Sequence, residues 1–362
     1  MKYFNFFAAL LLLIIYSLGR IPPSETFNLW LVTFIIPIGL VMNIIFMVTG
    51  ILMKKKSALY FLIVLVAGSN YLFSTIGVKS LFKARKASPA ESFTVLNYNV
   101  SAFNEKYVAR SEGFNEMPDS EQSALLEWVI SNESDIQCYQ EVSYSPASPD
   151  ADLLGIFRKH GYDYYFSASP NWRDSSYFGI LIISRFPMIS KGDVIVSENG
   201  FNRICYADIG MGRDTIRIVN VHLQSMQMKG FHPGFSETID DRTRSVRVVL
   251  RKLKSGVFER SRQIKQLIEF VEASPYPVIC AGDFNELPYS FSYQMLKRHL
   301  RNSFEESGRG FGFTYNGNTL GMLRIDNQFY SSSSLRSLDF QTLDTVKFTD
   351  HFPVSGSYIL RN

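Results

Sequence analysis

The sequence predicts an α/β domain that follows an apolar helical region, and three observations support this fold class. Residues 1 to 90 form long apolar runs that contain almost no acidic residue. From residue 93 onward, short apolar runs alternate with segments of helical spacing, and several of the short runs end at Gly, Asn or Asp, as buried strands of an α/β sheet do. The second part, of roughly 270 residues, is long enough for one domain with a full core.

The apolar region contains three runs: Tyr3 to Leu18, Phe27 to Met53, and Ala58 to Val78. Because a helix needs about 20 apolar residues to cross a bilayer, the second and third runs are long enough. The first is shorter and follows Lys2, so a signal peptide is the alternative, although no Ala-x-Ala cleavage pattern follows it. We predict a transmembrane region over residues 1 to 78, with helices near 3 to 18, 27 to 53 and 58 to 78.

Charge separates the two parts of the chain. Residues 1 to 90 hold nine Lys or Arg and one acid, Glu25, which leaves 28 basic and 32 acidic residues in the rest. We assign residues 79 to 92 to a basic linker and 93 to 362 to the α/β domain. A net charge of about −4 on that domain disfavours bulk binding of nucleic acid by phosphate neutralisation.

The position of lysines predicts the orientation in the membrane. Lysine and arginine in short loops favour the cytoplasm, and the tightest such loop is Lys54-Lys55-Lys56. If this loop lies in the cytoplasm, the α/β domain lies on the opposite side of the membrane, whether or not the first apolar run is cleaved as a signal peptide. The basic linker opposes this orientation, because its charges would then lie outside. Three adjacent lysines in a short hairpin are, however, harder to translocate than scattered charges that lead into a large domain. We therefore expect an integral membrane protein with an extracytoplasmic domain.

The three cysteines, Cys138, Cys205 and Cys280, each lie in an apolar run. An odd number gives no disulfide framework, so we expect buried free thiols.

Polar residues stand at the ends of the first predicted strands. The run from Phe93 to Val100 alternates as a strand that ends in Asn99, and after a helix over Ser120 to Ser131 a second strand, Asp135 to Glu141, ends on a carboxylate. Asn99 by itself is an ordinary turn residue. Glu141 suits a hard cation, because Mg²⁺ takes oxygen ligands.

The middle of the chain gives further strands: Gly161 to Phe166, Phe178 to Ser184, and a hairpin of Ile204 to Ile209 with Thr215 to Val221. Asn220 and His222 project to one side at the end of this hairpin. A lone His beside a strand is usually structural. Residues 224 to 255 are polar and basic, either a solvated helix or a functional loop, and a helix from Glu259 to Ala273 follows.

The apolar run Tyr276 to Cys280 leads into Ala281-Gly282-Asp283-Phe284-Asn285. In extended chain, Asp283 and Asn285 project to the same side, which places a carboxylate and an amide near one small volume. Asp and Asn after a strand are also common turn formers. A helix near Tyr293 to Leu300 follows. The last two polar motifs are Asp326, in a strand from Leu323 to Tyr330, and Asp350-His351, which precedes an apolar strand.

In order and spacing, these motifs resemble the endonuclease/exonuclease/phosphatase superfamily, the group of DNase I, AP endonucleases, neutral sphingomyelinases and inositol polyphosphate 5-phosphatases. The resemblance covers residues 93 to 359, and Gly282-Asp283-Phe284-Asn285 and Asp350-His351-Phe352-Pro353 are its most specific parts. It implies a four-layer α/β/β/α sandwich of two mixed sheets. It also implies a Mg²⁺-dependent hydrolase of phosphate esters, with Mn²⁺ as a possible substitute.

The resemblance further implies a role for each residue. Glu141 would be the main metal ligand, with Asn99 and Asp350 close to the metal. Asp283, helped by Asn285, would orient or deprotonate the attacking water. His351, held by Asp326, would contact the scissile phosphate, and His222, with Asn220 beside it, would assist the leaving group.

The sequence departs from the family pattern at two places. Thr349 replaces the common Ser, and Asn327-Gln328 replaces an aromatic-apolar pair. The Asn-x-His form at 220 to 222 disfavours abasic-site repair. The substrate, nucleic acid or phospholipid headgroup, stays open because specificity lies in loops. The membrane bilayer is the one further partner that we infer, and no protein partner follows from the sequence. A catalytically inactive, membrane-tethered binding module is the alternative function.

Overall fold

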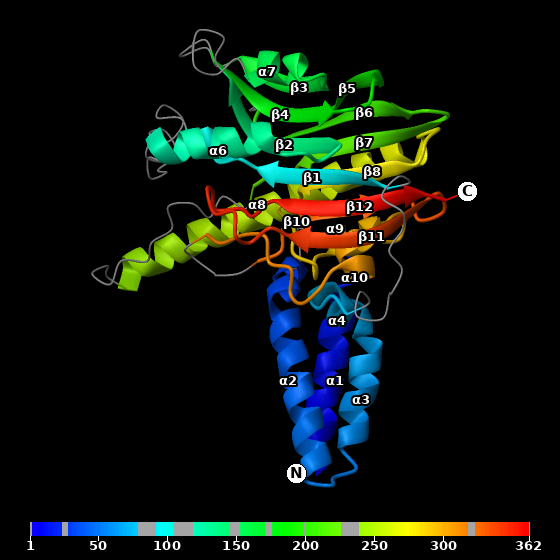
Figure 1. Ribbon diagram of the computed structural model, residues 1–362. Helices are drawn as coiled ribbons and strands as arrows, with labels where there is room; N and C mark the ends of the chain where they lie inside the picture. Colours follow the sequence, from blue (N-terminus) through cyan, green and yellow to red (C-terminus); the bar gives the residue numbers. More distant parts are fainter. Residues whose placement is uncertain are drawn as a thin grey trace.

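The computed structural model describes residues 2–23, 28–78, 92–104, 119–144, 153–170, 176–198, 200–225, 239–317 and 323–361. An apolar helical bundle lies below an α/β sandwich (Figure 1). The bundle consists of α1 (Lys2–Leu18), the short 3-10 turn η1 (Leu29–Leu31), α2 (Val32–Leu52), α3 (Ala58–Ala67) and α4 (Ser69–Thr75).

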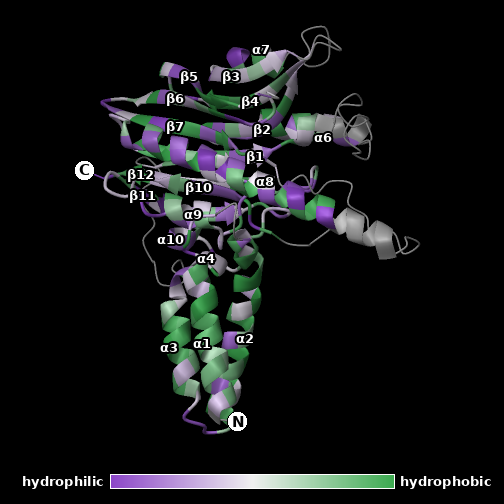
Figure 2. Ribbon diagram, turned by 180° about the vertical axis from the view of Figure 1, so that it is seen from behind, coloured by the Kyte–Doolittle hydropathy of each residue, from purple (hydrophilic) through white to green (hydrophobic). Residues whose placement is uncertain are grey.

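The bundle has its own small core, built from one side of each helix. Tyr16, Ile36, Phe61 and Tyr71 are buried there, while many apolar side chains on the outside of the bundle are exposed. Its surface is accordingly hydrophobic (Figure 2). The run Leu29–Leu52 is long and apolar enough to cross a membrane.

The prediction of a single helix over residues 58 to 78 is wrong. The chain bends by 71° between α3 and α4. At the bend, a β-carbon on Gly68 would lie 2.4 Å from the Tyr16 ring, so only glycine allows this close approach of α3 to α1. As a result, α4 turns away from the bundle and lies against the sandwich (Figure 1).

The sandwich contains two six-stranded sheets, and the prediction of a four-layer fold of mixed sheets is confirmed. One sheet has the strand order β11-β12-β1-β2-β4-β3 and the other β5-β6-β7-β8-β10-β9. The pairs β1 with β2 and β7 with β8 are parallel, and the other neighbours are antiparallel. The strands of the first sheet are β1 (Phe93–Asn99), β2 (Ile136–Tyr144), β3 (Asp163–Pro170), β4 (Tyr177–Ser184), β11 (Leu335–Thr342) and β12 (Val354–Leu360). Those of the second are β5 (Met188–Val196), β6 (Arg203–Met211), β7 (Asp214–His222), β8 (Val278–Asp283), β9 (Arg301–Asn302) and β10 (Asp326–Tyr330).

Helices cover the outer faces of both sheets. On the first lie α6 (Asp119–Ser131) and α7 (Leu153–Lys159), which share a buried core with its strands. On the second lie α8 (Ile239–Glu272) and α9 (Phe291–Leu296), while α10 (Ser303–Ser307) follows β9. The short 3-10 turn η4 (Ser101–Asn104) follows β1. Side chains such as Val95, Ile182, Ile218 and Ile279 fill the space between the sheets.

Polar side chains also cross between the two sheets. The Gln328 amide donates to the main-chain oxygen of Val95 and to the Asn97 side chain, at 2.9 Å each. Each of these groups is fully buried, so the hydrogen bonds offset the cost of removing them from water. This departure from the family pattern therefore has a structural role here.

Several expected elements differ from those observed. Residues 239 to 255 belong to one helix with 259 to 272, so the solvated-helix interpretation of that segment is right, and the helix extends beyond the sandwich (Figure 1). Part of the segment, residues 226 to 238, and most of the predicted linker, 79 to 91, lie outside the described residues. The helix expected near 293 to 300 is α9, which ends at Leu296. The three cysteines are buried and free, as expected.

Candidate active site

The polar residues predicted from the sequence gather at one edge of the sandwich, between the two sheets. Asn99 ends β1 and Glu141 lies near the end of β2 in the first sheet. In the second sheet, His222 ends β7 and pairs in register with Asp283 at the end of β8, which pairs with Asp326 at the start of β10. The sandwich thus brings the ends of five strands to one place.

A continuous chain of polar contacts links six of these residues. The Asn99 amide nitrogen donates to Glu141 Oε1 at 3.0 Å and to Asp283 Oδ2 at 3.1 Å. An imidazole lies beside each carboxylate: His222 Nε2 is 3.5 Å from Glu141 Oε1, and His351 Nε2 is 3.8 Å from Asp283 Oδ2. Asp326 completes the chain, because its Oδ2 lies 2.9 Å from His351 Nδ1.

Unusual backbone conformations hold the carboxylates in place. Glu141 has φ +53° at a bulge in the pairing of β2 with β4, and such bulges re-aim side chains. Gly282 has φ +144°, and a β-carbon there would lie 2.1 Å from the Val221 carbonyl oxygen, so the Gly before Asp283 is required. Asn285 also has a positive φ, +49°. Its backbone N–H donates to Asp283 Oδ1 at 2.8 Å.

His351 is buried and surrounded by carboxylates. Burial disfavours its charged form, but the negative charges of Asp326, Asp283 and Asp350 outweigh burial and raise the pKa of the imidazole above its ordinary value. Burial has the opposite effect on a carboxyl group. It disfavours the charged form of Asp326 and is the main reason that the pKa of Asp326 is raised. The hydrogen bond from Nδ1 to Asp326 fixes the ring so that Nε2 faces Asp283.

His222 is held in a similar way, by a main-chain group. Its Nδ1 lies 3.2 Å from the carbonyl oxygen of Phe201, so Nδ1 carries the hydrogen and Nε2 faces the site. This Nε2 atom is buried and has no hydrogen-bond partner among the described residues. Buried polar atoms are rarely left unpaired. His222 Nε2 is thus well placed to hydrogen-bond a bound group.

Asn220 and Asn285 do not join this chain of contacts. The Asn220 amide accepts from Gln140 at 2.7 Å and donates to the main-chain oxygens of Tyr139 and Leu181, at 3.0 Å each. Asn220 therefore braces one sheet against the other below the site, rather than pointing into it beside His222 as expected. The Asn285 amide donates to the Leu223 carbonyl oxygen at 3.1 Å, which fixes the turn after Asp283.

The segment before β12 closes the site. Asp350 Oδ1 accepts from the Ser101 hydroxyl at 3.0 Å. Thr349 donates to the main-chain oxygen of Asn99 at 3.0 Å and accepts from the His351 N–H at 3.1 Å, so Thr caps this turn in place of Ser. The Tyr315 ring packs edge-on against His351, with centroids 5.0 Å apart.

Tyr315 was not predicted as a site residue. Burial and the nearby Asp350 carboxylate raise the pKa of its hydroxyl. Its place in the site depends on an isolated pairing of Tyr315 with His351, a contact between distant segments that no local sequence pattern marks.

Two groups of residues could hold a metal ion. The first consists of Glu141, Asp350 and the Asn99 amide, all offering the oxygen donors that Mg²⁺ prefers. In the structure the Asn99 amide nitrogen faces Glu141 and Asp283. Rotating the amide by half a turn would bring its oxygen to that position. The second is the buried group of Asp283, Asp326 and His351, whose ligand atoms lie within 4.8 Å of one another. In the second group His351 Nδ1 is already hydrogen-bonded to Asp326, so the chemistry of the donors favours the first.

Comparison with protein families agrees with this geometry. Residues 96–351 match the endonuclease/exonuclease/phosphatase family, which is most of the chain and includes every strand end that forms the site. The chain belongs to the endonuclease/exonuclease/phosphatase family. Residues 1–75 match a second family, a domain of unknown function named DUF8431. The matched segment ends at Thr75, the last residue of α4.

Solved structures with the same fold are distant in sequence. An endonuclease/exonuclease/phosphatase protein from Beutenbergia cavernae is 16% identical with a TM-score of 0.52, and the match covers 75% of this chain and 72% of that one. A humanized TDP2 of D. rerio is 14% identical with a TM-score of 0.51, over 74% of this chain and 98% of that one. No curated protein matches the sequence. At such low identity these structures show the family fold and leave the substrate open.

Proposed function

We propose that the protein is a membrane-anchored, Mg²⁺-dependent hydrolase of phosphate esters. One observation carries this proposal: the continuous chain from His222 through Glu141, Asn99, Asp283 and His351 to Asp326. Two imidazoles with fixed Nδ1 contacts and a set of carboxylates face one volume at the edge of the sandwich. This is the arrangement that hydrolysis of a phosphate ester needs.

In the proposed reaction, water attacks the phosphorus atom in line with the leaving oxygen. The ester P–O bond breaks, the alcohol leaves with a proton, and the phosphate product keeps the oxygen of the water. Asp283 orients the water or accepts its proton. His351 donates a hydrogen bond to a phosphate oxygen. His222 gives the Nε2 proton to the leaving oxygen when both of its ring nitrogens are protonated, and Nδ1 keeps its hydrogen bond to Phe201.

Glu141, Asp350 and Asn99 are the residues that would hold Mg²⁺, with Mn²⁺ as a possible substitute. When bound, such an ion neutralises charge on the phosphate. Asp326 and Asn285 act through other residues: Asp326 orients His351, and Asn285 fixes the turn after Asp283. Asn220 supports the site by bracing the sheets.

The N-terminal helices support the proposed anchoring. Leu29–Leu52 meets the length and hydropathy of a span, and the bent pair α3 and α4 meets them together. Exposed apolar side chains cover the outside of the bundle. In water such a surface would be unfavourable, whereas lipid would cover it. We assign residues 1 to 78 to the membrane region and 93 to 362 to the catalytic domain.

A direct assay tests the proposed function. The full chain in detergent should hydrolyse bis(p-nitrophenyl) phosphate when Mg²⁺ is present, and Asp283→Asn should remove the activity. Hydrolysis that continues in the Asp283→Asn protein would show that another site is responsible. Saturable binding of phosphate esters without turnover would favour the alternative, an inactive binding module on the same fold.

A further inference from the structure

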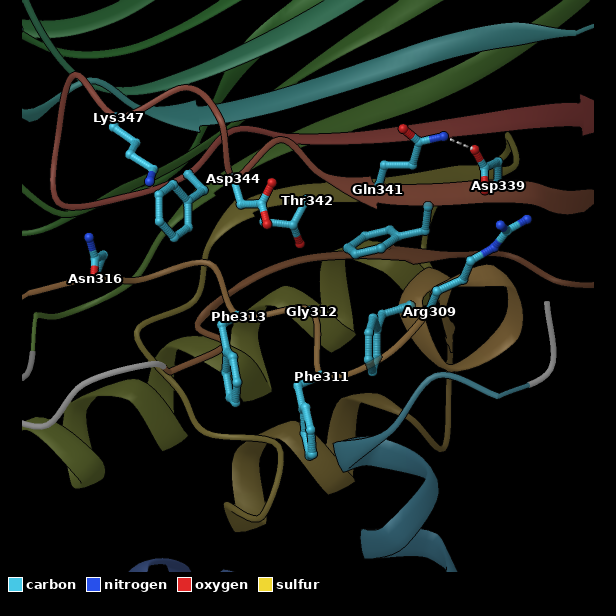
Figure 3. Close-up of a pocket in the computed structure, with 13 residues that line it drawn as sticks. Arg309, Phe311, Gly312, Phe313, Asn316, Asp339, Gln341, Thr342, Asp344 and Lys347 are labelled. Atoms are coloured by element: carbon cyan, nitrogen blue, oxygen red, sulfur yellow. Dashed lines mark hydrogen bonds between the residues drawn. The ribbon is translucent and has the colours of Figure 1, made fainter. Parts of the chain in front are cut away.

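A cavity of 770 Å³ lies beside the candidate active site and is separate from it. Five phenylalanines line it together with charged and amide side chains (Figure 3). The aromatic members are Phe304, Phe311, Phe313, Phe340 and Phe352, and the charged members are Arg309, Asp339, Asp344 and Lys347. A cavity with a large apolar share and a few polar groups is typical of a ligand site.

The cavity and the active site share a wall. This wall is made of two paired segments, because the N–H of Asn316 donates to the carbonyl oxygen of Asp350 at 2.8 Å and the N–H of Phe352 donates to that of Thr314 at 2.7 Å. Asn316 and Phe352 line the cavity. Their neighbours Tyr315 and His351 lie in the active site. A molecule with its phosphate in the site is therefore within reach of the cavity.

Phe311 and Phe313 point out of the cavity wall in the same direction. Their rings are stacked, with centroids 5.3 Å apart and planes 5° apart. Both point away from β11, toward the side of the domain where α4 lies (Figure 3). Phe311 is 51% exposed, more than any other described aromatic side chain after residue 78. Exposed neighbouring aromatic rings are costly in water and mark an interaction surface.

Glycines set this arrangement. Gly310 and Gly312 have φ values of +65° and +57°, so the chain turns between the two phenylalanines. A β-carbon at Gly312 would lie 2.3 Å from the Phe304 ring, which excludes other residues there.

The same loop is tied to the membrane region. Gly310 and Gly77 exchange two main-chain hydrogen bonds, at 2.8 and 3.1 Å, just after the end of α4. The exposed phenylalanines are thus held beside the end of the bundle that adjoins the sandwich. The bundle therefore places Phe311 and Phe313 at the level of the bilayer surface.

We propose that the substrate is a phospholipid of the surrounding bilayer, whose phosphate enters the active site while part of its acyl chain lies against Phe311 and Phe313 and in the adjoining cavity. This inference rests on the proposed hydrolase function and names its substrate class. On the cavity wall the charges of Arg309 and Lys347 are balanced by Asp339 and Asp344, so the cavity has no excess charge, and the phenylalanines receive apolar chain. Nucleobases also stack on aromatic rings. The position of Phe311 and Phe313 beside the apolar bundle is therefore what favours a lipid over a nucleic acid.

The test uses the full chain in nanodiscs of phosphatidylcholine and phosphatidylglycerol, with Mg²⁺. It compares the wild type with a Phe311→Ser, Phe313→Ser double variant and with Ile189→Ser. Ile189 is 62% exposed on β5, far from the bundle (Figure 1), and serves as the matched apolar control. Two substrates are followed: the nanodisc phospholipid and soluble bis(p-nitrophenyl) phosphate.

We expect the double variant to lose about ten-fold or more in kcat/KM on the phospholipid, because two aromatic contacts with lipid are removed. Its activity on the soluble diester should stay within about two-fold of wild type, since no group of the active site changes. Ile189→Ser should leave both activities unchanged. Equal phospholipid hydrolysis by wild type and double variant would overturn the inference.

Two other outcomes separate this inference from the proposed function. If the wild type hydrolyses the soluble diester or DNA but no phospholipid, the substrate class is wrong and the hydrolase function stands. If it hydrolyses none of them, the proposed function fails and the inference fails with it. Phe311→Trp adds a measurement that needs no turnover. Brominated phospholipid should quench this variant more than the wild type, whose three tryptophans give the background, and equal quenching of the two proteins would contradict contact of residue 311 with the bilayer.

Discussion

The guanidinium of Arg324 donates a hydrogen bond to the main-chain carbonyl oxygen of Ser74, which joins the segment leading into β10 to the last turn of α4. The same side chain donates to Tyr293 and Asn327 and stacks on the Phe304 ring, 4.2 Å from its centroid. Arg324 stands two residues before Asp326, which orients His351. The apolar bundle is therefore attached directly to the segment that leads into β10, the strand that supports the candidate active site.

Arg324→Met should destabilise the protein. It removes a donor from three buried acceptors, of which the Asn327 oxygen keeps a hydrogen bond from Asn302. We therefore expect a loss of about 2 to 4 kcal/mol in the free energy of unfolding. Unfolding by denaturant in detergent micelles measures this. Arg262→Met is the matched control, because the Arg262 side chain is 66% exposed and pairs only locally with Glu259, and it should change stability by less than about 0.5 kcal/mol. Equal stabilities of the two variants would show that the contact with α4 contributes little.

The residues that react with substrate should be sensitive to small changes. Asp283→Asn keeps an oxygen to accept the Asn285 N–H but removes the charge, and His351→Ala removes the imidazole. Each should lower kcat by roughly a hundred-fold to a thousand-fold on bis(p-nitrophenyl) phosphate. Asp214→Asn and His299→Ala, away from the site, control for loss of a carboxylate and of an imidazole. A loss below about ten-fold would mean that the assigned roles are wrong.

Asp326 should act through His351 rather than on the substrate. Asp326→Asn keeps an oxygen that accepts from His351 Nδ1, whereas Asp326→Ala leaves that nitrogen without a partner. We expect Asp326→Ala to lower kcat by about a hundred-fold with little change in KM, and Asp326→Asn to recover part of the activity. A general loss of structure would lower both variants alike, which circular dichroism would detect.

Metal removal tests the oxygen-donor site. EDTA should abolish hydrolysis, and Mg²⁺ or Mn²⁺ should restore it. Glu141→Gln weakens the ligand that we place first, so the Mg²⁺ concentration for half-maximal activity should rise by at least about ten-fold. Glu259→Gln, on the exposed part of α8, should leave that concentration unchanged. Full activity in EDTA would exclude a metal-dependent reaction.

The sequence predicted most of the strands that carry the site, because each is a short apolar run that ends in a polar residue. Three edge strands escaped prediction: β5, β9 and β11. The residues of β5 and β11 are largely half-buried or exposed and form no apolar run, and β9 has only two residues. The spacing of Asn220 and His222 correctly predicted that they share a side. It could not show that Asn220 reaches only the other sheet, because this depends on how the two sheets pack.

Contacts between segments far apart in the chain could not be predicted from the sequence either. Asn70 lies within the third apolar run, yet its amide donates to Gln294 and accepts from Lys297 at 2.8 Å, both in the sandwich. The unusual Asn327 has its explanation in the same region, where it accepts from Arg324. Such pairs follow from the bend at Gly68, which the apolar run does not reveal.

The side of the membrane on which the domain lies is the last prediction. The N-terminus and the turn that holds Lys54, Lys55 and Lys56 lie at the end of the bundle farthest from the sandwich (Figure 1). Because lysines in short loops stay in the cytoplasm, this arrangement places the domain outside. Arg20, at the opposite end of α1, and the basic linker residues Lys79, Lys83, Arg85 and Lys86 oppose this orientation, but they are scattered, whereas the three lysines are adjacent in a short turn. A protease added to intact spheroplasts should therefore digest residues 93 to 362, while a cytoplasmic control protein stays whole. Protection of the domain until the membrane is permeabilised would place the active site, and any phospholipid that it hydrolyses, on the cytoplasmic side.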